Sequence, residues 1–71
     1  MIKLNTKVLK EALRTRDYEL EYFAARVDQH APPVSNQTAR DWLSGKKQPT
    51  ELQLCFISGC VGKTEQELTA P

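Results

Sequence analysis

The sequence contains no apolar run that approaches the ~20 residues required to cross a lipid bilayer. The stretch that follows Met1 also lacks the long apolar segment that is typical of a secretory signal. We therefore expect a cytoplasmic protein that does not associate with a membrane.

Cysteine and histidine are scarce, with two cysteines and one histidine in the whole chain. Cys55 and Cys60 fall in an apolar stretch that is expected to be helical, so their side chains diverge and a disulfide between them is not expected. A zinc site would require a second pair of Cys or His residues at short spacing, and His30 stands alone. The cysteines are therefore interpreted as small buried side chains of a reduced protein, with no metal or cofactor.

The residue sets that support catalysis are missing as well, since no nucleophile stands near a base and no carboxylates are paired. A chain of 71 residues buries one modest core, which predicts a single domain over residues 1–71. We expect a protein that is not an enzyme and binds no small-molecule ligand.

Neither sign of charge dominates: 10 Lys and Arg residues oppose 9 Asp and Glu residues, which gives a net charge of +1. This balance argues against a protein that coats nucleic acid without regard to sequence. The charges are nevertheless segregated, because residues 1–16 and 29–50 are basic whereas residues 17–28 and 51–71 are acidic. A fold that brings the two basic segments together would produce one basic face.

What the sequence does contain is a short helix with clear ends, within residues 35–45. Ser35 can accept a hydrogen bond from a first-turn backbone N–H, and Gly45 can adopt the left-handed conformation that ends a helix. Ala39, Trp42 and Leu43 recur at the spacing of one helical face. This face predicts attachment to a core, with polar residues left on the other side.

The polar side of this helix carries amide, guanidinium and carboxylate groups, which hydrogen-bond base edges in the DNA major groove. The residues expected to read bases are Asn36, Gln37, Arg40 and Asp41. Hydroxyl, ammonium and backbone N–H groups nearby suit DNA phosphates. The residues expected to contact the DNA backbone are Ser35, Thr38, Lys46, Lys47 and Thr50.

Apolar periodicity predicts further helices on both sides of this segment. One helix is expected over residues 6–14, and a second starts between residues 17 and 19 with Asp17 as its cap. Residues 28–33 contain two prolines, so either the second helix gains an extra turn or the connection bulges outward.

The most apolar helix is expected between Thr50, as its cap, and Gly62. A helix that is apolar on more than one side has to bury more than one face, which predicts a dimer interface here. A short last helix follows, with Thr64 as its cap and Leu68 pointing inward.

In this order, the features resemble the lambda-repressor-like (Cro/C1-type) helix-turn-helix proteins. Their recognition helix is typically followed by Gly, a basic residue, two variable positions and Pro, and residues 42–49 read Trp-Leu-Ser-Gly-Lys-Lys-Gln-Pro. The resemblance covers residues 34–68 and is weaker over residues 9–27. It implies an all-α, compact domain of four to five helices. The chain departs from the family in one respect, a lengthened turn between the second and third helices, because residues 28–33 add several residues to a connection that is usually tight.

The resemblance also implies a sequence-specific DNA-binding transcriptional regulator, a repressor of the kind found in phages or mobile elements. It would act as a homodimer on a near-palindromic operator in double-stranded DNA. In the alternative that stays open, the same fold binds a protein such as a toxin, another repressor or a polymerase. The near-zero net charge and the acidic start of the second helix favour this alternative. A strong salt dependence of DNA binding would favour the regulator.

Overall fold

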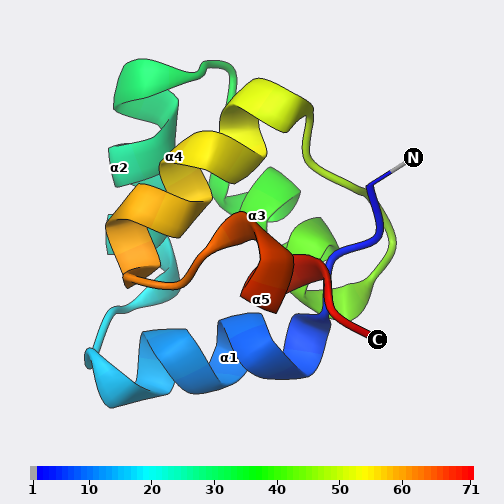
Figure 1. Cartoon of the computed structure of the whole chain (residues 1–71). Helices are drawn as coiled ribbons and strands as arrows, with labels where there is room; N and C mark the ends of the chain where they lie inside the picture. The colour runs from blue at the N-terminus through cyan, green and yellow to red at the C-terminus, as the bar shows by residue number, and fades with distance from the viewer. Residues whose placement is uncertain (1) are drawn as a thin grey trace.

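Five α-helices surround one apolar core in the computed structural model, which describes residues 2–71 (Figure 1). The helices are α1 (Thr6–Thr15), α2 (Leu20–His30), α3 (Asn36–Ser44), α4 (Glu51–Val61) and α5 (Glu65–Thr69). No strand occurs within residues 2–71, and the predicted all-α class is confirmed. None of these helices is long and apolar enough to span a membrane.

Helices α3 and α4 begin and end at the residues expected from the sequence. The Ser35 hydroxyl accepts a hydrogen bond from the Thr38 N–H at 3.1 Å, and Gly45 ends α3 with a φ of 81°. At α4, Thr50 and Gln53 cap each other's backbone N–H groups, and Gly62 ends the helix with a φ of 71°. These caps satisfy backbone groups that have no partner inside the helix.

The corner between α1 and α2 differs from the sequence prediction, because Asp17 does not cap α2. Asp17 takes a left-handed φ of 56°, and the N–H groups of Asp17 and Tyr18 donate back to the carbonyls of Arg14 and Leu13. The N-cap of α2 is Glu19, whose side chain makes no capping hydrogen bond. Asp17 therefore closes α1 instead of opening α2, because its backbone turns before its side chain can reach the next helix.

The connection between α2 and α3 follows the first of the two alternatives, since α2 extends to His30. Asp28 accepts a hydrogen bond from the Val34 N–H at 2.7 Å, and Gln53 of α4 donates to the Ala31 carbonyl at 3.4 Å. Ala31 is buried, and the Pro32–Pro33 peptide bond is cis. The added length is therefore held against the domain at both ends.

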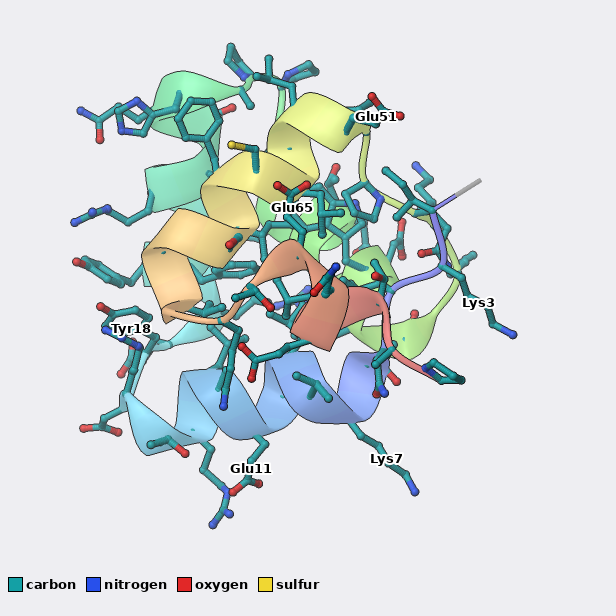
Figure 2. All side chains as sticks on the ribbon, in the orientation of Figure 1. Lys3, Lys7, Glu11, Tyr18, Glu51 and Glu65 are labelled. Carbon is teal, nitrogen blue, oxygen red and sulfur yellow. The ribbon has the colours of Figure 1, made fainter. Side chains whose placement is uncertain are left out.

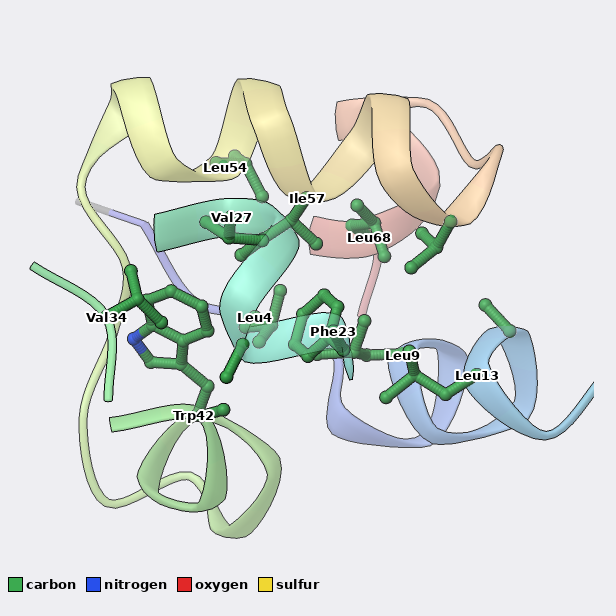
Figure 3. Close-up of a cluster of buried hydrophobic side chains, with 14 residues drawn as sticks. Leu4, Leu9, Leu13, Phe23, Val27, Val34, Trp42, Leu54, Ile57 and Leu68 are labelled. Atoms are coloured by element: carbon green, nitrogen blue, oxygen red, sulfur yellow. The ribbon is translucent and has the colours of Figure 1, made fainter. Parts of the chain in front are cut away.

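The core receives side chains from all five helices and from the chain before α1 (Figure 3). Trp42 and Phe23 meet edge to face with ring centroids 6.2 Å apart, and both are essentially inaccessible to solvent. The largest other side chains that are fully buried are Leu9, Ile57, Leu68, Val27 and Val61. Each large apolar side chain of this kind contributes roughly 1.5–3 kcal/mol through burial. Trp42 thereby fixes α3 to the body of the domain.

Helix α4 keeps part of its apolar surface outside the core. Leu52 is 59% exposed, Cys55 is exposed, and Phe56 stacks on His30 of α2 with centroids 4.9 Å apart. The prediction that both cysteines are buried is therefore wrong for Cys55. Cys60 is half-buried; burial raises the pKa of its thiol, and the nearby Arg26 and Arg16 oppose this effect only partly. Leu52 and Cys55 thus form an exposed apolar strip on one side of α4.

Candidate functional site

The polar side of α3 is presented to solvent because its other side is anchored in the core. α3 packs against α2 and α1, with Ala39 and Trp42 buried at the contact. Asn36, Gln37 and Arg40 are all exposed on the outer surface. An amide pair and a guanidinium therefore stand together on one face of a short capped helix.

Asp41 does not share that exposed surface, which corrects its expected place among the outward-facing side chains. It is only 6% exposed, and its carboxylate accepts a hydrogen bond from Gln37 Nε2 at 3.0 Å. The Lys47 ammonium lies 3.7 Å from the second carboxylate oxygen. The chain turns back at Gly45, so that Lys46 and Lys47 both contact Asp41.

The same turn places the two lysines beside the end of α3. The Asp41 carbonyl accepts hydrogen bonds from the N–H groups of Lys46 at 2.9 Å and Lys47 at 3.2 Å, and from the Ser44 hydroxyl at 3.2 Å. Both lysine side chains are exposed. Two cations are thus held next to the amide and guanidinium groups, as a phosphate contact would require.

The hydroxyl groups expected near phosphates take part in helix caps. Ser35 Oγ lies 3.1 Å from Thr38 Oγ1 as well as from the Thr38 N–H, and Ser35 is exposed while Thr38 is half-buried. The exposed Thr50 accepts from the Gln53 N–H, and its own N–H donates to the Gln53 side chain at 2.9 Å. The Thr50 N–H is therefore already engaged, whereas its hydroxyl donates to no group within residues 2–71.

The structure also brings a basic residue to α3 that was not predicted as part of the site. Lys10 of α1 and Arg40 of α3 line the same shallow depression, together with Leu20, Leu43 and Ser44. The two basic segments of the sequence therefore meet at this point. The sequence indicated this meeting only through the alternation of basic and acidic segments. That pattern does not distinguish Lys10 from the other basic residues of 1–16.

Several acidic side chains lie on other helices and not on α3. Figure 2 shows Glu51 and Glu65 projecting from α4 and α5, and Glu11 on the outer side of α1. Glu11 is paired with Arg14 on the same helix. On α3 itself, the carboxylate of Asp41 is covered, so the exposed charge there comes from Arg40. The outer surface of α3 consequently suits a partner that is negatively charged.

No protein-family model, no curated protein and no solved structure matches this chain. Within residues 2–71, no group of three or more Cys, His, Asp or Glu residues is arranged to hold a metal ion. The function is therefore assigned from the side chains of α3 and the groups beside them.

Proposed function

We propose that the protein is a sequence-specific DNA-binding transcriptional regulator, acting as a cytoplasmic repressor of the lambda-repressor-like (Cro/C1-type) helix-turn-helix class. α2 and α3 would form the helix-turn-helix, and α3 would enter the major groove. The observation that carries this proposal is the exposed set Asn36, Gln37 and Arg40 on a helix that Trp42 anchors from the opposite side.

Each exposed group on α3 has a natural DNA partner. The amides of Asn36 and Gln37 match adenine, and the Arg40 guanidinium matches guanine. Lys46 and Lys47, held at the end of α3 by the Asp41 carbonyl, would neutralise phosphates on the same side. Bases would then be selected by α3, while the lysines fix its register on the duplex.

We further propose that the protein binds as a homodimer on a near-palindromic operator. The support is the exposed apolar strip of α4, where Leu52 and Cys55 face solvent. A two-fold axis in the protein calls for a matching two-fold relation between half-sites in DNA. The proposed division of roles is base reading by α3 and self-association by α4.

The proposal is tested by fluorescence-anisotropy titration of the full chain with duplex from its own upstream region and with scrambled duplex, across a salt series. Gln37→Ala is expected to lose roughly 1–3 kcal/mol of binding free energy on the specific duplex and to keep its weak binding to scrambled DNA. Gln66→Ala is the matched control, because Gln66 is an exposed glutamine on α5. If upstream DNA is not preferred, selection from random duplexes supplies the specific site.

The same titration also distinguishes the DNA-binding regulator from the alternative, in which the same fold binds a protein. The exposed Leu52 and the net charge of +1 favour that alternative. Specific binding that weakens as salt rises supports the regulator, because phosphate contacts release counterions. Equal losses for Gln37→Ala on both duplexes would refute base reading by this residue. If neither upstream DNA nor any selected duplex is preferred over scrambled DNA, the protein-binding alternative replaces the regulator.

A further inference from the structure

Asp41 is the one charged side chain that is buried among residues 2–71. Charged groups are rarely buried unless they are paired and hydrogen-bonded. Asp41 has both kinds of partner: Gln37 Nε2 at 3.0 Å from one carboxylate oxygen and Lys47 Nζ at 3.7 Å from the other. It therefore lies between a proposed base-reading side chain and a proposed phosphate contact.

The chemistry of this contact fixes the orientation of the Gln37 amide. An ionised carboxylate can only accept hydrogen bonds, so the nitrogen end of the amide has to face Asp41. The amide oxygen and the second N–H hydrogen are left for another partner. An unrestrained glutamine amide turns over easily, because rotation about its last bond is broad and roughly two-fold.

We propose that Asp41 is a positioning residue that makes Gln37 select adenine over guanine. The inference rests on the proposed function and goes beyond it, because Asp41 itself touches no base. In the major groove adenine offers one acceptor and one donor, which match the free N–H and the oxygen of the restrained amide. Guanine offers two acceptors, and its O6 would meet the amide oxygen of Gln37.

Lys47 explains how a carboxylate can be tolerated beside DNA. Its side chain is 63% exposed, whereas that of Asp41 is 8% exposed, so the positive partner is the one that faces solvent. The ion pair leaves the carboxylate close to Gln37 and presents the ammonium to an approaching phosphate. Asp41 thus orients the Gln37 amide, while the Lys47 ammonium compensates its negative charge on the side that would face DNA.

The test is selection from random duplexes with the full-length wild type, Asp41→Asn and Gln37→Ala, followed by titration of paired duplexes that differ only by A or G at the affected base pair. Asn can accept or donate, so Asp41→Asn keeps the size of the residue and removes the restraint on Gln37. The preference for A over G is expected to fall by roughly tenfold or more in Asp41→Asn, with the other positions unchanged. Gln37→Ala is expected to lose the preference at the same position.

An unchanged A-to-G ratio in Asp41→Asn would overturn the inference, and so would an equal loss at every position, since that reports a merely structural role. If Asp41→Asn does not fold by circular dichroism, Asp41→Ser replaces it, because a hydroxyl also both accepts and donates. A wild type that selects no consensus would refute the proposed function itself. A wild-type consensus with an unaltered Asp41→Asn preference would refute the role of Asp41 alone.

Discussion

Helices α3 and α4 are held by the same devices and differ in what they show to solvent. Both begin at a hydroxyl cap, Ser35 or Thr50, and both end at a left-handed glycine. α3 turns one apolar side inward and exposes hydrogen-bonding groups, whereas α4 buries one apolar side and exposes a second, which includes Leu52. Caps therefore determine where a helix begins and ends, whereas its exposed face determines the chemistry of its partner.

The largest effect is expected from a substitution on the buried side of α3. Trp42→Ala is expected to destabilise the domain by roughly 3–5 kcal/mol, because it removes the apolar contact that anchors α3 and leaves a cavity. Urea unfolding followed by circular dichroism measures this loss. The control is Leu52→Ala on the exposed side of α4. At concentrations where the protein is monomeric, so that the proposed dimer contact does not contribute, it is expected to stay within about 0.5 kcal/mol of the wild type.

Comparable losses for the two variants would contradict the assignment of an inner and an outer side. A small effect of Trp42→Ala alone would mean that α3 is attached mainly through its other contacts. In that case Trp42 would not be the anchor of α3, and the proposed reading of bases would lose that part of the observation on which it rests.

The exposed side of α4 is tested by measuring self-association. Leu52→Glu places a charge in the proposed dimer contact and is expected to shift the protein toward monomer in sedimentation equilibrium. The free energy of unfolding of the monomer should change by less than about 0.5 kcal/mol, because the residue lies at the surface. Ala25→Glu is the matched control, since Ala25 is an exposed apolar residue on α2.

If Leu52→Glu and the wild type sediment identically, α4 does not mediate dimer formation, and its exposed strip would have to serve a different partner. A wild type that is monomeric at all concentrations would lead to the same conclusion. Weakened DNA binding by Leu52→Glu, with half-sites still recognised singly, would agree with two copies of α3 acting together on one operator.

Local features of the molecule could be predicted from the sequence because they depend on neighbours along the chain. The caps of α3 and α4 are of this kind, since a hydroxyl and a backbone N–H three residues later meet in any helix start. The apolar face that contains Trp42 follows from helical spacing alone. Because the same spacing leaves Asn36 and Gln37 on the outer side, most of the candidate site could be predicted as well.

Apart from the Asp17 corner, which is local, the features that could not be predicted depend on how segments distant in the sequence come together. Asp41 is buried and contacted by Lys46 and Lys47 from beyond Gly45, and helical spacing does not contain that information. Lys10 joins Arg40 only when α1 is placed beside α3. Cys55 is exposed for the opposite reason, since α4 is apolar on more sides than the core of one domain covers.

The capping boxes of α4 and α5 offer a finer comparison, because they share a geometry but differ in charge. Gln53 closes the first box and Glu67 the second. The pKa of Glu67 is lowered, first by its hydrogen bond from the Thr64 backbone N–H, then by the Thr64 side chain, with Lys63 adding to the effect. Because the pKa is lower in the folded state, the stabilisation is present above the ordinary value of 4.5 and is lost as pH falls through the folded value.

Glu67→Gln should therefore show a slightly weaker dependence of the melting temperature on pH below about 4.5, because its amide oxygen can still accept from Thr64 but no longer titrates. The effect is expected to be small, since the group is exposed to solvent and its helix is short. Glu65→Gln is the matched control, because it removes an equal charge from the same helix while leaving the hydrogen bonds between Thr64 and Glu67 in place. Identical acid profiles for Glu67→Gln and the wild type would mean that the box holds α5 through its hydrogen bonds alone, as the uncharged box of α4 does.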